Sequence, residues 1–388
     1  MTNSSDSKTV IELFKASFGA SPQRVWRAPG RVNLIGEHTD YNGGHVLPCA
    51  LNLATDLAIA PNGTSHVRLV SDRFNDEVVI FELEKAQSHA REVHWSRYVS
   101  AVVAAMQVNG YEVRGCDLAI TSTVPDGAGL SSSAALEVVL ATALSDLFDL
   151  NIDLVSAAKL GQYAENHFVD CQCGIMDQLV SACAIEHHAL LIDCATLMTK
   201  AVSLPPSHDI FVIHSGVRRG LVDSEYNQRR IECEKAARVL EVEMLCSADL
   251  DALERVRAAL TDTEFRRARH VISEDIRCRQ MAAMLEAGRS DELASLMSAS
   301  HHSLRDDFEV SLPSIDFLVE ILQTALGEEG GARMTGGGFG GCVVAIAPST
   351  FRPTLEEYIL PKYHAQTGNE PTLWTVQSAD GVGSLETI

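Results

Sequence analysis

The chain has 388 residues, of which 46% are hydrophobic, a composition typical of soluble globular proteins. Its 52 acidic and 31 basic side chains give a formal net charge of −21, which repels phosphate backbones and disfavours nucleic acid as a partner. No window approaches the roughly 18 consecutive apolar residues of a membrane span, and the first nine residues lack a basic region followed by an apolar core. We therefore expect a cytoplasmic protein that contacts no membrane and carries no secretory signal.

Hydrophobic periodicity predicts helices and strands without a strict alternation between them. In the first half we predict helices at 10–18, 95–107, 132–147, 155–167 and 177–184, and strands at 24–28, 31–35, 46–60, 67–70, 78–81 and 117–123. In the second half we predict strands at 210–214 and 342–347, and helices at 224–240, 263–287 and 314–326. This mixture favours an α+β fold over a doubly wound sheet.

The length exceeds that of one typical core, so we expect two domains. Pro205 and Pro206 interrupt regular structure before the strand predicted at 210–214. We therefore predict an N-terminal α+β domain of residues 1–203 and a C-terminal α+β domain of residues 204–388.

A run of six polar residues at 37–42 follows the apolar strand predicted at 31–35 and is bounded by glycines. Such a run is unsuited to a core, because each unpaired buried polar group costs about 1–3 kcal/mol. Short carboxylates accept hydrogen bonds from neighbouring hydroxyl groups. We interpret the run as a rigid rim that faces a polyhydroxylated ligand; the alternative is an ordinary exit from a strand into a loop.

The segment PDGAGLSSSAA (125–135) lies between a predicted strand and a predicted helix. Gly127 and Gly129 allow the backbone to approach an anion closely, and the following helix offers free N–H groups and the positive end of its dipole. The serines at 131–133 add hydroxyl donors, one of which could bind Mg²⁺. We interpret the segment as a phosphate-binding loop, although it lacks the Gly-Lys-Ser/Thr of a Walker A loop. The alternative is a serine-rich helix cap after a glycine turn.

The glycine-rich segment 336–341 formally satisfies the pattern GxGxxG. A dinucleotide-binding loop must follow a strand and open a helix, whereas here we predict a helix before the glycines and a strand after them. This order excludes a nicotinamide-dependent oxidoreductase. Five glycines in six positions still require unusual dihedral angles or close approach to another group, so we expect a backbone wall against the active site; the alternative is a tight helix-to-strand connection.

Three charged residues could perform chemistry beside these loops. Asp177 lies at the head of a predicted helix, after Gly174, and would be either a helix N-cap or a general base or orienting charge for a hydroxyl group. Glu165 ends the preceding helix and could bind a metal. Arg31 could neutralise charge on a phosphoryl group in transfer.

The ten cysteines form no C-x-x-C pair. Cys171 and Cys173 have the wrong spacing for a usual zinc knuckle. We therefore expect reduced thiols with no metal role.

Four segments together resemble the GHMP small-molecule kinases: GRVNLIGEHTDYNGG (30–44), PDGAGLSSSAA (125–135), CGIMDQ (173–178) and RMTGGGFGGC (333–342). The first of them resembles the galactokinase signature within that superfamily. The resemblance spans nearly the whole chain, in family order. It implies two α+β domains with the active site in the cleft between them, and ATP-dependent phosphorylation of the anomeric hydroxyl group of D-galactose.

The resemblance also implies a role for individual residues. Asp177 would take the proton of the C1 hydroxyl group, and Arg31 would stabilise the transition state. The residues that would hold the sugar are Glu37, His38, Thr39, Asp40, Gly174 and Tyr226. Those that would contact ATP are Ser71, Gly127, Ala128, Gly129, Leu130, Ser131, Ser132 and Ser133. Those that would bind Mg²⁺ are Ser133 and Glu165.

We expect a monomer whose partners are galactose and ATP. Two alternatives remain open. One is the same reaction on a related sugar, such as N-acetylgalactosamine or arabinose. The other is a non-catalytic sugar and ATP sensor on the same scaffold, which loss of Asp177, Arg31 or part of the serine loop would favour.

Overall fold

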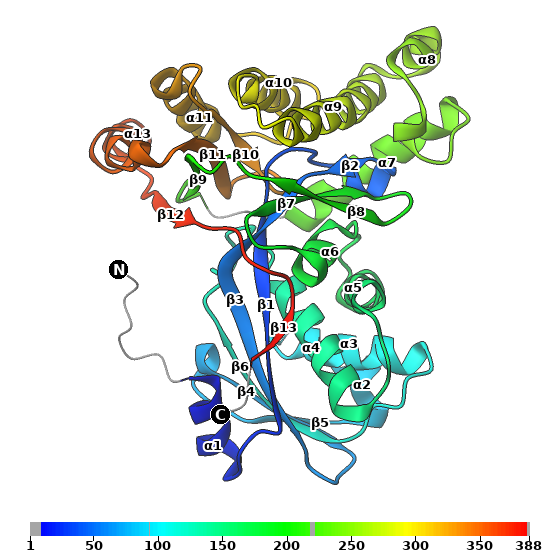
Figure 1. Ribbon diagram of the computed structural model, residues 1–388. Coiled ribbons are helices and arrows are strands. Elements are labelled where there is room, and N and C mark those ends of the chain that lie inside the picture. Colours follow the sequence, from blue (N-terminus) through cyan, green and yellow to red (C-terminus); the bar gives the residue numbers. More distant parts are fainter. Residues whose placement is uncertain (1–8, 93, 218–221, 386–388) are drawn as a thin grey trace.

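The computed structural model of the protein describes residues 9–92, 94–217 and 222–385. The first eight residues, where we predict no secretory signal, lie outside this part of the chain. Among the helices that it describes, none is both long and apolar enough to cross a membrane. The chain forms a lower half, made mainly of N-terminal residues, and an upper half, made mainly of C-terminal residues, and two long strands reach from one toward the other (Figure 1).

The lower half is built on a six-stranded sheet whose order is β13-β1-β3-β6-β4-β5. Helix α1 packs against β3, β4 and β6, on the opposite side of the sheet from α3, α4 and α5 (Figure 1). The strands are β1 (Arg24–Asn33), β3 (Pro48–Pro61), β4 (His66–Ser71), β5 (Val79–Glu82), β6 (Cys116–Ser122) and β13 (Gly383–Leu385). The helices are α1 (Val10–Phe18), α2 (Ala86–His89), α3 (Arg97–Val108), α4 (Ser132–Phe148), α5 (Leu154–Ala164) and α6 (Met176–Cys183).

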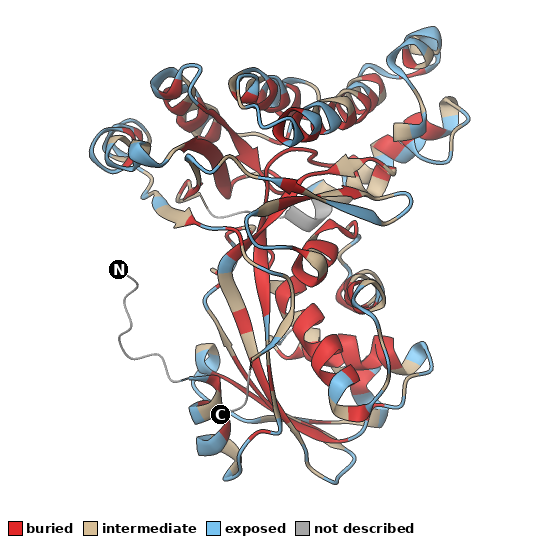
Figure 2. Ribbon diagram, in the orientation of Figure 1, coloured by how far each residue is buried: buried red, intermediate tan, exposed pale blue. Residues whose placement is uncertain are grey.

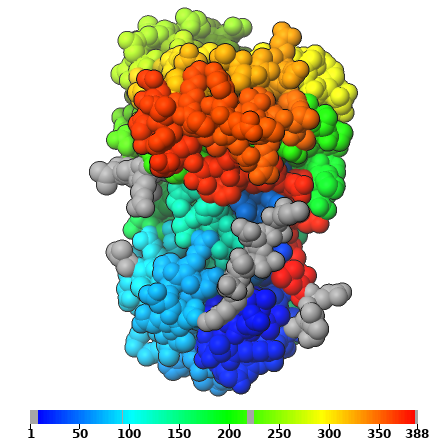
Figure 3. Space-filling model, turned by 90° about the vertical axis from the view of Figure 1, so that its left-hand side faces the viewer, coloured from blue at the N-terminus to red at the C-terminus, as the bar shows by residue number. Residues whose placement is uncertain are grey.

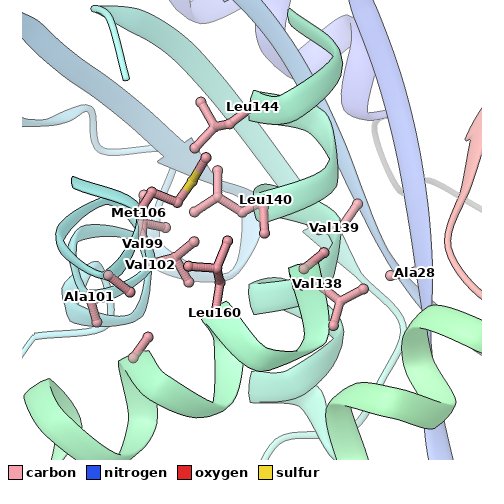
Figure 4. Packing of buried hydrophobic residues seen from close by; sticks show 14 of the residues in the cluster. Ala28, Val99, Ala101, Val102, Met106, Val138, Val139, Leu140, Leu144 and Leu160 are labelled. Atoms are coloured by element: carbon pink, nitrogen blue, oxygen red, sulfur yellow. The ribbon is translucent and has the colours of Figure 1, made fainter. Parts of the chain in front are cut away.

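Helix α4 is the centre of the lower core and is buried along most of its length (Figure 2). In Figure 4, Leu140 and Leu144 of α4 lie opposite Val102 and Met106 of α3, with Leu160 of α5 beside them. Burying one such aliphatic side chain contributes about 1.5–3 kcal/mol. This packing fixes the N-terminal end of α4, which is where the phosphate loop joins it.

The upper half contains a four-stranded sheet of order β10-β11-β9-β12 and, below it, a three-stranded sheet of order β2-β7-β8. Helices α10 and α11 pack on β10, and α9 contacts β2 and β8. The strands are β2 (His45–Val46), β7 (His188–Asp193), β8 (Met198–Ser203), β9 (His208–His214), β10 (Gly331–Thr335), β11 (Cys342–Pro348) and β12 (Thr372–Val376). The helices are α7 (Val222–Val239), α8 (Leu250–Arg255), α9 (Asp262–Glu286), α10 (Leu293–Asp306), α11 (Pro313–Leu326), α12 (Arg352–Thr354) and α13 (Leu360–Thr367).

The glycine-rich segment requires a correction. Strand β10, which we did not predict, precedes the glycines, and β11 follows them in an antiparallel pair in which Thr335 is opposite Cys342. The segment is therefore a hairpin connection and does not follow a helix directly. The exclusion of a dinucleotide-binding loop stands, because a strand and not a helix follows the glycines.

The end of the chain also departs from the prediction. Strand β13 pairs with β1, with Leu385 opposite Val25, so residues that we assigned to the C-terminal domain complete the N-terminal sheet. Red atoms from this end lie beside blue N-terminal residues in the lower half of Figure 3. A strand of three residues carries too little periodicity to be recognised from sequence. The boundary after residue 203 stays a prediction.

Candidate active site

A cleft of about 1080 Å³ lies between the two halves. The N-terminal half supplies most of its lining, and His214, Tyr226, Asn227, Gly336 and Gly337 come from the C-terminal half. The glycine-rich hairpin thus lines the cleft, as predicted. The predicted site residues that line it are Arg31, Glu37, His38, Asp40, Gly127, Gly129, Leu130, Ser131, Ser132, Ser133, Glu165, Gly174, Asp177 and Tyr226.

Asp177 and Arg31 form a two-point ion pair in this cleft. Arg31 Nε donates to Asp177 Oδ1 at 2.9 Å, and Arg31 Nη2 donates to Oδ2 at 2.8 Å. The Ser131 hydroxyl group also donates to Asp177, and Arg31 Nη1 donates to the Gly129 carbonyl at 2.6 Å. The N-cap position of α6 is Ile175, so Asp177 is not the helix cap that was its alternative interpretation. One carboxylate and one guanidinium therefore join β1, the phosphate loop and α6.

The phosphate loop has an alternating backbone conformation. Gly127, Gly129 and Ser131 have φ angles of 69°, 78° and 59°, in the left-handed region where glycine is least strained. Ser131 occupies the N-cap position of α4 but makes no capping hydrogen bond. A serine-rich cap therefore does not explain the loop. Its serines line the cleft at the start of α4, where free N–H groups and the helix dipole favour an anion.

Two residues predicted to contact ATP, Ala128 of this loop and Ser71 of β4, are not among those that line the cleft. Ala128 is buried, and its carbonyl accepts a hydrogen bond from Cys342 Sγ at 3.0 Å. Ser71 is also buried, and its hydroxyl oxygen accepts from the Arg73 backbone N–H at 3.4 Å. The Arg73 side chain secures the entry to the loop, since its Nη2 donates to the carbonyl of Val124 at 2.7 Å.

Glu37 links the polar rim to the upper half of the molecule. Its Oε1 accepts from the Gly336 N–H at 2.7 Å and from the Thr335 hydroxyl group at 3.1 Å, and it lies 3.3 Å from Arg333 Nη2. The Arg333 side chain is fully buried. The sequence analysis missed Arg333, because nothing in its local pattern marks it as the partner of a carboxylate 296 positions earlier.

His38 presents an unpaired nitrogen. Its Nδ1 lies 3.0 Å from the Tyr41 hydroxyl group, whereas its buried Nε2 has no hydrogen-bond partner among the residues described. The ring packs against Phe308 and Tyr226, with centroid separations of 4.6 and 5.4 Å. Burial lowers the pKa of His38 well below its usual value, so the imidazole is neutral at pH 7. An unpaired buried polar atom in a cleft is what a ligand hydroxyl group would satisfy.

Asp40 and Gly174 fit against each other on the rim. A Cβ atom on Gly174 would lie 1.9 Å from Asp40 Oδ2, so only glycine leaves room for this carboxylate. Burial, with the nearby charges of Asp177 and Glu37, raises the pKa of Asp40 to about 7.

Thr39, by contrast, is turned into the loop. Its Oγ1 lies 2.9 Å from the Gly36 carbonyl and 2.7 Å from that of His45, and the side chain is not exposed. Thr39 holds the rim in shape, and its position does not support direct contact with a substrate.

Glu165 and Ser133 are the predicted metal ligands. Glu165 lies in a π-helical turn, and the Ser133 hydroxyl group hydrogen-bonds its carboxylate. Gln178 Nε2 donates to Glu165 Oε2 at 3.1 Å and to Oε2 of the buried Glu137 at 3.0 Å. Burial raises the pKa of Glu165. One carboxylate and one hydroxyl oxygen facing a cleft suit a hard cation such as Mg²⁺.

Comparison with known proteins agrees with this arrangement. The galactokinase galactose-binding signature matches residues 12–61, which contain the rim. The N-terminal domain of the GHMP kinases matches residues 97–184, and their C-terminal domain matches residues 281–357.

Two solved structures match more than nine-tenths of the chain. Galactokinase from Lactococcus lactis, complexed with galactose, is 31% identical over 97% of this chain and 99% of its own, with a TM-score of 0.92. Mevalonate kinase from Methanococcus jannaschii is 17% identical over 93% of this chain and 99% of its own, with a TM-score of 0.67. The latter likeness is one of fold alone. On the galactokinase match and the rim signature together, the chain belongs to the galactokinase family of GHMP kinases and is a sugar kinase.

Proposed function

We propose that this kinase transfers the γ-phosphoryl group of ATP to the anomeric hydroxyl group of D-galactose, giving galactose 1-phosphate and ADP. The observation that carries the proposal is the ion pair of Asp177 and Arg31, which lies where the polar rim meets the phosphate loop. Phosphoryl transfer asks a protein mainly for positioning and for stabilisation of charge. This pair can offer both at the point where the two substrates meet.

On the acceptor side, the rim would hold the sugar. The carboxylate of Asp40 accepts hydrogen bonds from hydroxyl groups, the unpaired Nε2 of His38 is available for another, and Tyr226 closes the pocket beside it. Asp177 would then engage the C1 hydroxyl group, either by taking its proton or by orienting it. Both roles require a carboxylate within hydrogen-bond distance of that oxygen.

On the donor side, the residues from Gly127 to Ser133 would hold the phosphates of ATP at the N-terminal end of α4. Ser133 and Glu165 would hold Mg²⁺, which would supply positive charge to neutralise the phosphates of ATP. Arg31 donates a hydrogen bond to the Gly129 carbonyl of this loop and would stabilise charge on the phosphoryl group in transfer.

We infer that the enzyme works in the cytoplasm as a monomer within galactose catabolism. The support for a reducing compartment is that all ten cysteines, which lie in the described part of the chain, are free. The support for a monomer is that one chain supplies both walls of the cleft.

The test is direct measurement of ADP formed from ATP and Mg²⁺ with a panel of free sugars, namely galactose, N-acetylgalactosamine, arabinose and glucose. We expect the highest kcat/KM on galactose. Strong turnover of another sugar without turnover of galactose would overturn the choice of substrate. Absence of turnover on every sugar, with ATP and galactose still bound, would favour the sensor instead.

A further inference from the structure

Two cysteines that have no role in the proposed reaction, Cys171 and Cys173, meet the predicted magnesium ligand Glu165 in the cleft. One ligand atom from each lies within 4.8 Å of the others. Cys173 Sγ lies 2.9 Å from Glu165 Oε2 and 3.5 Å from the side-chain oxygen of Asn166. Both cysteines are half-buried residues, and both line the cleft.

The C-x-C spacing led the sequence analysis to expect no metal role. That expectation considered only ligands that neighbour each other along the chain. The third donor, Glu165, comes from the π-helical turn Glu165–Val169, which brings its carboxylate back over the cysteines. The cluster therefore needs no further cysteine from the sequence.

Two sulfur donors and one carboxylate oxygen match the preference of a thiophilic divalent cation, whereas Mg²⁺ takes oxygen ligands. Tetrahedral zinc has Zn–S distances of about 2.3 Å and Zn–O distances of about 2.0–2.2 Å, which place its ligand atoms about 3.4–3.8 Å apart. To reach that geometry, the widest separation in the cluster, at most 4.8 Å, would close by about 1 Å, and the 2.9 Å between Cys173 Sγ and Glu165 Oε2 would open by about 0.5–0.9 Å. Cys171 and Cys173 lie outside regular helix and strand, so small backbone rotations can supply this movement.

We propose that Cys171, Cys173 and Glu165 form a zinc-binding site inside the active-site cleft, with a water molecule as fourth ligand. The two thiols bind as thiolates and release their protons to solvent as zinc enters. Occupation of this site withdraws Glu165 from the magnesium site and so inhibits the kinase. The binding site stands on the cluster alone, and only the inhibition rests on the proposed function. Zinc and magnesium ions therefore exclude each other at one shared carboxylate.

The binding test uses reduced enzyme without nucleotide. Titration with Zn²⁺ in a calorimeter should give one site per chain, and titration with Cd²⁺ should give the ultraviolet charge-transfer band of a thiolate–metal bond. Cys171→Ser and Cys173→Ser should each lose this band and bind Zn²⁺ at least tenfold more weakly. Cys183→Ser, which changes a thiol at the end of α6, should behave as the unchanged enzyme does.

The competition test uses the unchanged enzyme and needs no variant to fold. Raising Mg²⁺ should weaken Zn²⁺ binding in proportion to its concentration, and Zn²⁺ should inhibit ADP formation less at high Mg²⁺. The site would be overturned if the Cd²⁺ band were absent. It would also be overturned if Cys171→Ser and Cys173→Ser bound Zn²⁺ as tightly as the Cys183→Ser control. Zinc binding that Mg²⁺ does not affect would overturn the shared carboxylate. Failure of catalysis with the band intact would count against the proposed function alone.

Discussion

The substitution Gly174→Ala tests how the rim is built. Gly174 has no positive φ angle, so alanine is compatible with its backbone. The added Cβ atom would lie 1.9 Å from Oδ2 and 2.3 Å from Cγ of Asp40, and real Cβ atoms essentially never approach other heavy atoms within 3.0 Å. Oδ2 must therefore retreat by at least 1.1 Å, the difference between those two limits. Rotation of the Asp40 side chain can move Oδ2 and Cγ away, and a backbone shift of about 0.1 Å relieves Asp40 Cβ, which lies 2.9 Å from the added atom.

The size of the effect follows from that displacement. A hydrogen bond of about 2.7 Å to a sugar hydroxyl group would stretch to about 3.8 Å, which is beyond hydrogen-bonding distance. Loss of one hydrogen bond to a charged group costs about 1.5–3 kcal/mol. Since about 1.4 kcal/mol corresponds to a factor of ten, kcat/KM for galactose should fall about 10- to 150-fold. The KM for ATP should change little, because Gly174 lies on the acceptor side.

Steady-state kinetics with galactose and ATP varied in turn measures both constants. Gly383→Ala is the matched control, since a Cβ atom there meets nothing within 4 Å. A double-mutant cycle with Asp40→Ala identifies the cause: once the carboxylate is gone, alanine at 174 should cost almost nothing further. The reasoning is refuted if Gly174→Ala keeps its galactose kcat/KM within about twofold of the unchanged enzyme. It is equally refuted if the full penalty persists in the Asp40→Ala background.

Three further predictions concern chemistry, pH and stability. Asp177→Asn should lower kcat about 10²- to 10⁴-fold in steady-state assays, with a much smaller change in the KM for galactose. A kcat near that of the unchanged enzyme would contradict the proposal that Asp177 acts on the C1 hydroxyl group. Burial raises the pKa of Asp40 to about 7, and protonation below this pH turns one acceptor oxygen of its carboxylate into a donor. The kcat/KM for galactose should therefore fall as the pH drops below 7, by at most about tenfold per pH unit, and level off above it. Asp40→Asn should remove this limb of the pH profile, and a flat profile for the unchanged enzyme would disprove the assignment. Arg333→Met should lower the free energy of unfolding in urea by about 3–5 kcal/mol, because it leaves the buried carboxylate of Glu37 without its cation. Arg352 lies in an exposed ion pair, so Arg352→Met is the control. An equal loss of stability in both variants would show that the buried ion pair is not the cause.

Local pattern was sufficient for the elements that hold the site. Helix α4 runs over Ser132–Phe148 where a helix at 132–147 was predicted, because this segment is rich in alanine and leucine, which favour a helix, and contains no glycine or proline. Strand β10 was missed although its partner β11 was predicted, since the five residues of β10 carry little periodicity and only pairing with β11 defines them as a strand. Strand β13 was missed for the same reason, as its partner β1 lies more than 350 residues away along the chain.

The sequence by itself determined which chemical groups are available for the site: a polar rim, a glycine and serine loop, and a carboxylate at the head of α6. Tertiary structure alone decided what each group faces. Asp40 turns to the cleft, Thr39 turns into its own loop, Glu37 binds the hairpin of the other half, and Glu165 meets a cysteine pair that the sequence had set aside. The reason is that hydrogen bonds and ion pairs depend on distance in space, which separation along the chain does not report.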